Sequence, residues 1–139
     1  MADQNAEGLL DTSAVVDLAR AKAIIGLPGK VVISAITVAE LNYGVALAAT
    51  RVEAVFRAER NARLRAWIEP LPFDELAADK YGELVALVRA HGRQPRPSRL
   101  DLMIAATAVR HNLPLYTFNG ADLAGLESVL TVVAPEPGG

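Results

Sequence analysis

The sequence contains no cysteine, which excludes a disulfide framework, a thiolate metal site and a cysteine nucleophile. It also lacks any apolar run of roughly 18 residues, the length that a membrane-spanning helix needs, so we expect no membrane association. The first residues, Met1 to Gly8, have neither a basic start nor an apolar core, so we expect no signal peptide. These absences together favour a protein of the cytoplasm.

The composition is that of a folded globular chain. Hydrophobic residues make up 52% of the 139 residues and charged residues 22%, which argues against disorder. A chain of this length fits one domain with a sizeable core. We therefore expect a single domain over residues 1–139, with flexible ends at 1–7 and 135–139.

Strand-like and helix-like segments alternate along the chain. The strand-like runs are 8–10, 31–36, 67–71, 115–118 and 131–133, and the helix-like segments are 14–20, 37–44, 51–66, 74–91 and 99–111. A further turn is expected over 23–27. This alternation predicts an α/β fold, a three-layer α/β/α sandwich with a mainly parallel central sheet. In such sheets the carboxyl ends of the strands share one edge, and sites form there at the topological switch point.

Four acids lie at or near the start of a predicted helix on that edge: Asp11, Glu40, Asp101 and Asp122. Three of them follow predicted strands, whereas Asp101 opens the apolar helix that begins after Ser98. Carboxylates that converge without a cation repel one another. Hard divalent ions such as Mg²⁺ or Mn²⁺ prefer oxygen ligands, so the pattern predicts a site for one of these ions.

Each acid also has a purely structural alternative. Asp11 is placed to act as a helix N-cap or in an Asx-turn. Glu40 has capping-box spacing from Thr37, and Asp101 has the same spacing from Ser98. Asp122 follows an Asn-Gly turn, where a solvated acid is ordinary. The conjunction of all four on one edge favours the metal site.

An acidic metal site with open coordination positions suits phosphodiester hydrolysis. Short polar residues beside the acids, Thr12, Thr117 and Asn119, are candidates to orient a ligand carboxylate or a water.

Basic residues that lead to the site are candidates to contact RNA: Arg93, Arg96 and Arg99. The net charge of −2 weighs against a nucleic-acid partner. Tyr43 and Tyr116 are each able to stack on a base, but core packing is the favoured interpretation for both.

The residues around the acids resemble PIN-domain proteins, and more narrowly the VapC toxins of type II toxin–antitoxin systems. The matching stretches are Leu10-Asp11-Thr12-Ser13, Ala39-Glu40-Leu41, Asp101 to Ala108 and Thr117 to Asp122. The resemblance implies an endoribonuclease dependent on Mg²⁺ or Mn²⁺, with the four acids as its catalytic metal ligands. It also implies a homodimer, and a cognate VapB-like antitoxin whose C-terminal segment covers the site. Leu123 stands where family members often carry an aromatic residue.

Two other classes of function remain as alternatives. A phosphoacceptor receiver would need paired acids after the first strand and a late lysine, but Asp11 has no acidic neighbour and no lysine follows Lys80. A non-catalytic regulatory or partner-binding α/β domain with an acidic metal site is the second alternative, and the complete set of acids argues against it.

Overall fold

A five-stranded parallel sheet forms the centre of the molecule, in the order β4-β3-β1-β5-β6. The computed structural model describes residues 6–19, 24–92 and 97–137. The strands of the sheet are β1 (Glu7–Leu10), β3 (Lys30–Ser34), β4 (Pro70–Leu71), β5 (Leu115–Tyr116) and β6 (Val132–Val133). The β-branched run in β3 suits a strand that is covered on both faces.

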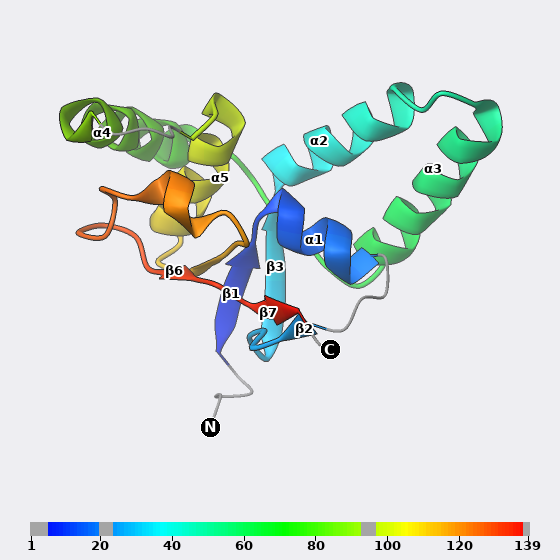
Figure 1. Cartoon of the computed structure of the whole chain (residues 1–139), viewed down its shortest axis with the longest axis horizontal. Coiled ribbons are helices and arrows are strands. Elements are labelled where there is room, and N and C mark those ends of the chain that lie inside the picture. Colours follow the sequence, from blue (N-terminus) through cyan, green and yellow to red (C-terminus); the bar gives the residue numbers. More distant parts are fainter. Residues whose placement is uncertain (1–5, 20–23, 93–96, 138–139) are drawn as a thin grey trace.

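Five α-helices and one 3₁₀ turn connect the strands of the described chain. They are α1 (Thr12–Ala19), α2 (Ala35–Ala46), α3 (Arg51–Arg65), α4 (Glu75–His91), α5 (Arg99–Arg110) and the turn η1 (Gly120–Leu123). In Figure 1, α4 and α5 lie together on one side, and α2 and α3 form a helical hairpin on the other. No helix in the described ranges is both long enough and apolar enough to cross a membrane.

One face of the sheet packs against α4 and α5. Leu9 and Leu115, which pair across β1 and β5, are buried in one cluster with Leu84, Leu102 and Ile104 of these helices. Successive side chains of a strand point to opposite faces, so the next residue of each strand belongs to the other layer.

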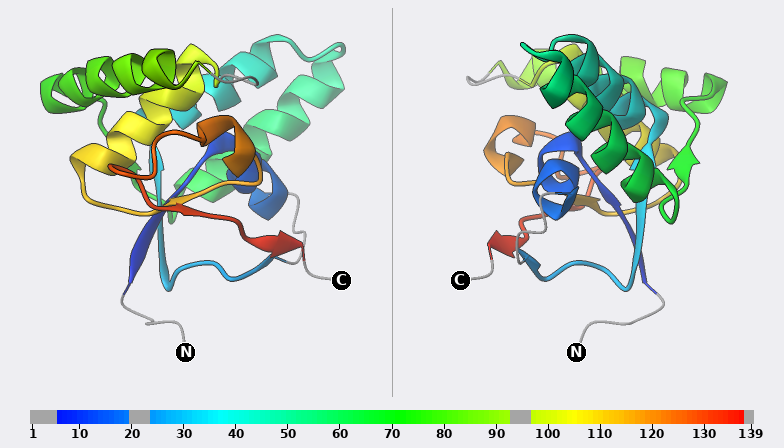
Figure 2. Two further views of the ribbon diagram at one scale, coloured as in Figure 1. Left: turned by 60° about the vertical axis from the view of Figure 1, so that its left-hand side comes forward. Right: turned by 90° about the vertical axis from the view of Figure 1, so that its right-hand side faces the viewer.

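The opposite face packs against α1, α2 and α3 (Figure 2). Leu10 and Ile33, which also pair across neighbouring strands, are fully buried with Val15 of α1, Leu41 of α2 and Leu64 of α3. The two clusters complete a three-layer α/β/α sandwich, which confirms the predicted fold class.

Several helix ends are where the sequence predicts them. The Asp74 side chain accepts a hydrogen bond of 2.9 Å from the Ala77 N–H and caps α4, and Gly92 ends that helix with a φ of 66°. The start of α2 differs from the prediction, because its N-cap is Ser34 and the helix begins at Ala35.

A small antiparallel pair lies outside the main sheet. The strand β2 (Ile24–Ile25) pairs with β7 (Glu136–Pro137). The turn predicted over 23–27 is therefore wrong for its described residues. Glu136 and Pro137 lie in β7, and Glu7 lies in β1. The predicted flexibility of the two chain ends stays a prediction.

The strand order sets the position of the candidate site. From β1 the chain continues to β3 and β4 on one side, and later returns to β5 and β6 on the other. The carboxyl ends of β1 and β5 therefore flank the switch point, where parallel sheets form their sites. Asp11 follows the first of these strands and Thr117 the second.

Candidate active site

A small cavity at the switch point is lined by three of the four predicted acids. Asp11, Asp101 and Asp122 share it with Thr117 and Asn119, and its volume is about 10 Å³. That space holds about one water-sized particle. Sequence positions 11, 101 and 122 are thus brought together from β1, α5 and η1.

Asp11 is held by three hydrogen bonds at the junction of β1 and α1. Its Oδ1 accepts from Ser13 Oγ at 2.7 Å and from the Ala14 N–H at 3.1 Å, and the Thr117 hydroxyl donates to its Oδ2. The bond from Ala14 is an N-cap interaction, so the structural alternative for Asp11 is confirmed, whereas its role as a metal ligand stays a prediction. The residue as a whole is 9% exposed and still lines the cavity.

Asp101 also has both a structural contact and a place in the cavity. Its N–H donates to Ser98 Oγ at 3.1 Å, and its Oδ2 accepts from the Ser98 N–H at 3.3 Å, which completes the predicted capping box. A carboxylate at a helix N-terminus is stabilised by the helix dipole. Capping therefore fixes the position of this acid at the wall of the cavity.

The loop after β5 connects Asp122 to Asp11. The Asp122 N–H donates to Asn119 O at 3.0 Å, and the Asn119 N–H donates to Thr117 Oγ1 at 3.0 Å. Thr117, only 1% exposed, in turn donates to Asp11. Thr117 thus contacts Asp11 as its predicted orienting role requires.

Glu40 lies next to this cavity rather than in its wall. The predicted capping box from Thr37 is wrong, because Ser34 caps α2 by accepting from the Ile36 N–H at 3.0 Å. Ser34 is closer to the end of β3, so its hydroxyl is the first to meet a free helix N–H. Glu40 instead accepts a 2.6 Å hydrogen bond from Thr12, the residue after Asp11.

Thr12 and Thr37 form a pair that the sequence did not reveal. Their hydroxyl oxygens are 3.1 Å apart, and Thr37 is fully buried one turn before Glu40. The two hydroxyls fix the relation of α1 to α2, and with it the position of the Glu40 carboxylate relative to Asp11.

Two larger cavities meet at Glu40. One, of about 460 Å³, is also lined by Thr12, Phe56, Arg57 and Arg60. The other, of about 370 Å³, is lined by Ala39, Glu40, Tyr43 and Leu100. Arg57 and Arg60 of α3 lie beside Glu40 because α3 folds back along α2, a placement that the local sequence does not reveal.

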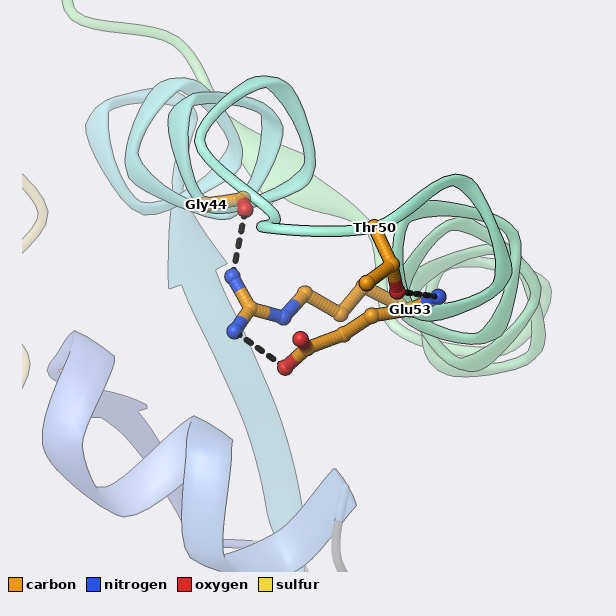
Figure 3. Close-up of polar contacts among 4 residues, drawn as sticks. Gly44, Thr50 and Glu53 are labelled. Atoms are coloured by element: carbon orange, nitrogen blue, oxygen red, sulfur yellow. Dashed lines mark hydrogen bonds and ion pairs between the residues drawn. The ribbon is translucent and has the colours of Figure 1, made fainter.

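Arg57 fastens the hairpin formed by α2 and α3 (Figure 3). Its Nη1 donates to Gly44 O at 2.6 Å, and its Nη2 donates to Glu53 Oε1 at 2.6 Å. Thr50 caps α3 by accepting from the Glu53 N–H at 3.1 Å. The guanidinium thus satisfies a carbonyl in the last turn of α2, where helices leave such groups without helical partners.

The donor set suits a hard divalent cation. All the polar side chains around the small cavity offer carboxylate, hydroxyl or amide oxygens, which are the ligands that Mg²⁺ and Mn²⁺ prefer. Within the described ranges, no three acidic or histidine side chains form a ready metal-binding group. Asp11 and Asp101 direct carboxylate oxygens toward hydroxyl and N–H donors.

The remaining predictions concern arginine and tyrosine side chains near the site. Arg99 is exposed at the start of α5, whereas Arg93 and Arg96 lie outside the described residues. Their binding of RNA stays a prediction. Tyr116 packs against the core as expected, but Tyr43 is 66% exposed, so the core interpretation is wrong for that residue.

Comparison with known proteins matches most of the chain to one protein family. The PIN domain family matches residues 8–125. The chain is 35% identical over 136 residues to ribonuclease VapC5 of Mycobacterium tuberculosis, covering 95% of this chain and 96% of the relative. It is 38% identical over 105 residues to the toxin FitB of Neisseria gonorrhoeae, covering 68% and 72% of the two chains.

Solved structures agree with this result. A member of the VapBC family of toxin–antitoxin systems, VapBC-5 from Mycobacterium tuberculosis, matches with a TM-score of 0.71 and 35% identity, over 93% of this chain and 97% of that chain. FitAcB from Neisseria gonorrhoeae matches with a TM-score of 0.71 and 28% identity, over 89% and 94%.

Proposed function

The chain belongs to the PIN-domain family, and from this premise we propose that it is an endoribonuclease, the toxin of a toxin–antitoxin pair. The observation that carries the proposal is the cavity at the switch point, lined by Asp11, Asp101 and Asp122. Relatives named ribonuclease and toxin, at 35% and 38% identity, support it. The reaction is the hydrolysis of RNA phosphodiester bonds.

Mg²⁺ or Mn²⁺ is the proposed cofactor. Asp11, Asp101 and Asp122 would hold it from the walls of the cavity, and Glu40 would join them from the neighbouring side. When bound, such an ion stabilises charge on the phosphoryl group and promotes the ionisation of water.

The chain's own hydroxyl groups keep Asp11 and Glu40 in place. Thr117 and Ser13 donate to Asp11, and Thr12 donates to Glu40. Each of these hydrogen bonds holds a carboxylate oxygen in a defined position beside the proposed metal site.

Replacement of Asp11 tests the metal site. Asp11→Asn keeps an oxygen at the cavity but removes a charge, and losing even an outer-shell partner costs 10–100-fold in activity or metal affinity. We expect RNA cleavage to fall by at least ~100-fold and Mn²⁺ binding, measured by calorimetry, to weaken. Asp79→Asn, an exposed acid on α4, is the matched control. Unchanged cleavage and Mn²⁺ binding in Asp11→Asn would refute the proposal.

Replacement of Glu40 separates charge from hydrogen bonding. Glu40→Gln can still accept from Thr12, so the thermal unfolding temperature should stay near that of the wild type. Cleavage of total RNA with Mg²⁺ or Mn²⁺ should nevertheless drop sharply, because an anionic ligand is lost. Strong destabilisation with cleavage retained would instead identify Glu40 as a structural residue.

A VapB-like antitoxin and a second copy of the chain are the proposed protein partners, and the cytoplasm is the proposed location. The solved neighbour described as a member of the VapBC family supports the antitoxin. Expression of the chain should arrest bacterial growth, and co-expression of the antitoxin should relieve the arrest. Light scattering of the purified chain tests the homodimer, and a monomeric mass would count against it.

A further inference from the structure

The cavity of about 370 Å³ beside Glu40 lies between the two helices that carry candidate acids. Glu40 and Tyr43 are three residues apart on α2, so they share one face of that helix. Leu100, on the facing wall, directly precedes Asp101 of α5. A ligand in this cavity would therefore contact the immediate neighbours of two proposed metal ligands.

Apart from Glu40, the described residues that line this cavity are apolar or aromatic. Tyr43 is 66% exposed and Leu100 42% exposed, and Ala39 completes the apolar lining. Single-stranded RNA presents unstacked bases, which proteins bind by stacking them on aromatic side chains. A tyrosine ring with most of its surface in solvent is free to serve as such a platform.

We propose that Tyr43 stacks on the nucleobase next to the scissile phosphate, with Leu100 and Ala39 forming the apolar floor of the base site. This inference rests on the proposed ribonuclease function. Among the described residues that line the cavity, only Glu40 is charged. Its carboxylate would repel a phosphate, so the uncharged base is the part of the nucleotide that fits.

The backbone that carries Tyr43 is held in place by hydrogen bonds. Its carbonyl accepts from the Leu47 N–H at 3.0 Å, and the carbonyl of the next residue, Gly44, accepts from Arg57 at 2.6 Å. The last turn of α2 is therefore fixed to α3 (Figure 3). The backbone that carries the ring therefore does not have to be ordered when a base binds, which lowers the entropic cost of binding.

The experiment measures cleavage of a short single-stranded RNA with Mn²⁺ by the wild type, Tyr43→Ala and Tyr43→Phe. Tyr43→Ala should raise KM roughly 5- to 150-fold, the range for one stacked base, and Tyr43→Phe should stay near the wild type. Trp67→Ala is the matched control, because Trp67 is 68% exposed and lines a separate cavity. Its KM should not change.

A substrate without the flanking base tests the contact from the other side. The wild type should lose a similar factor on an RNA that is abasic at that position, and Tyr43→Ala should lose little more. An abasic penalty as large in Tyr43→Ala as in the wild type would overturn the proposal. So would equal KM values for Tyr43→Ala and the wild type, or a change confined to oligomeric mass or antitoxin affinity, which would make Tyr43 a protein-contact residue.

Failure of the proposed base site can be distinguished from failure of the proposed ribonuclease function. If the wild type cleaves RNA and the tyrosine variants do not affect cleavage, the base site is wrong and the ribonuclease stands. If the wild type cleaves no RNA with either ion, the proposed function is wrong and the base site falls with it.

Discussion

Gly8 of β1 has no side chain, and this leaves room for the aromatic ring of Tyr116. A Cβ atom at Gly8 would lie 2.8 Å from Tyr116 Cδ1 and 2.7 Å from Pro28 Cγ, closer than packed atoms approach. Gly8→Ala should therefore lower the free energy of unfolding by about 1–3 kcal/mol, the usual cost of overpacking. Urea denaturation provides the measurement.

Gly82, in the middle of α4, is the control for Gly8. A Cβ there would meet no atom within 4 Å, so Gly82→Ala should stabilise the protein by about 0.5–1 kcal/mol through helix propensity. Destabilisation of both variants by the same amount would show that the ring of Tyr116 is not the cause at Gly8.

Asp74 links stability to pH. Its hydrogen bond from the Ala77 N–H, followed by the charge of Arg110 at 3.2 Å, holds the pKa of Asp74 below its ordinary value of 3.8. The folded state thus binds the proton less tightly than the unfolded state. The stabilisation is complete above the ordinary pKa and is lost as the pH falls through the folded-state pKa.

Asp74→Asn tests this linkage. Asparagine caps a helix about as well as aspartate, so the helix start should survive while the titration disappears. The variant should be less stable than the wild type at pH 7, and the difference between their unfolding temperatures should shrink as the pH approaches 3. A difference that is constant with pH would contradict the assignment.

Local sequence predicts the acids better than it predicts their surroundings. Asp11 and Asp101 are identifiable because each stands where an apolar strand ends or an apolar helix starts. The neighbourhood of Glu40 is not, because Thr37 and Ser34 both offer a hydroxyl near the start of α2. Only the end of β3 decides which of them meets the first free N–H.

At the scale of elements, Arg57 couples α2 to α3. Arg57→Met keeps the apolar stem and removes the hydrogen bonds to Gly44 O and Glu53. Amide exchange should accelerate at Leu47, whose N–H donates to Tyr43 O in the last turn of α2. Hydrogen exchange resolved by NMR would detect this. Arg63→Met, an exposed arginine of the same helix, should leave exchange at Leu47 unchanged.

The short strands β2 and β7 could not be predicted from the sequence. Two isoleucines and a Glu-Pro pair are too short to show any periodicity, and proline normally argues against a strand. The pairing exists because the rest of the fold brings residues 24–25 and 136–137 side by side. Long elements such as α4 and α5 are predictable because their caps and apolar faces are local.

At the scale of the whole molecule, Ser34 and Thr107 join the two layers that hold the acids. Their hydroxyl oxygens are 3.1 Å apart and both residues are fully buried. Thr107 already donates to Met103 O at 2.9 Å, so Ser34 must donate to Thr107. The bond connects the N-cap of α2 to the centre of α5.

Thr107→Val would leave the Ser34 hydroxyl without its acceptor at nearly constant volume. An unsatisfied buried group costs about 1–3 kcal/mol, and we expect a loss of that size in urea denaturation. Thr107→Ser keeps the hydroxyl and should recover most of the loss. The double variant with Ser34→Ala should be less destabilised than the sum of its parts, and strict additivity would show that the two hydroxyls are not coupled.

The layers of the whole fold are predictable, but the order of its strands is not. Alternating apolar segments predict a parallel sheet between helical layers, and the structure has that arrangement. The local sequence does not indicate that β5 pairs with the free edge of β1. This pairing nevertheless brings Thr117 into contact with Asp11.

The position of β1 between β3 and β5 also has a consequence for the synthesis of the chain. Asp11 accepts a hydrogen bond from Thr117, which is synthesised 106 residues later, and Asp122 follows Thr117 in the chain. A translating ribosome must therefore release most of the polypeptide before the acids can meet. If the finished protein destroys RNA, this delay shields the ribosome and the message from the product while it is still being made.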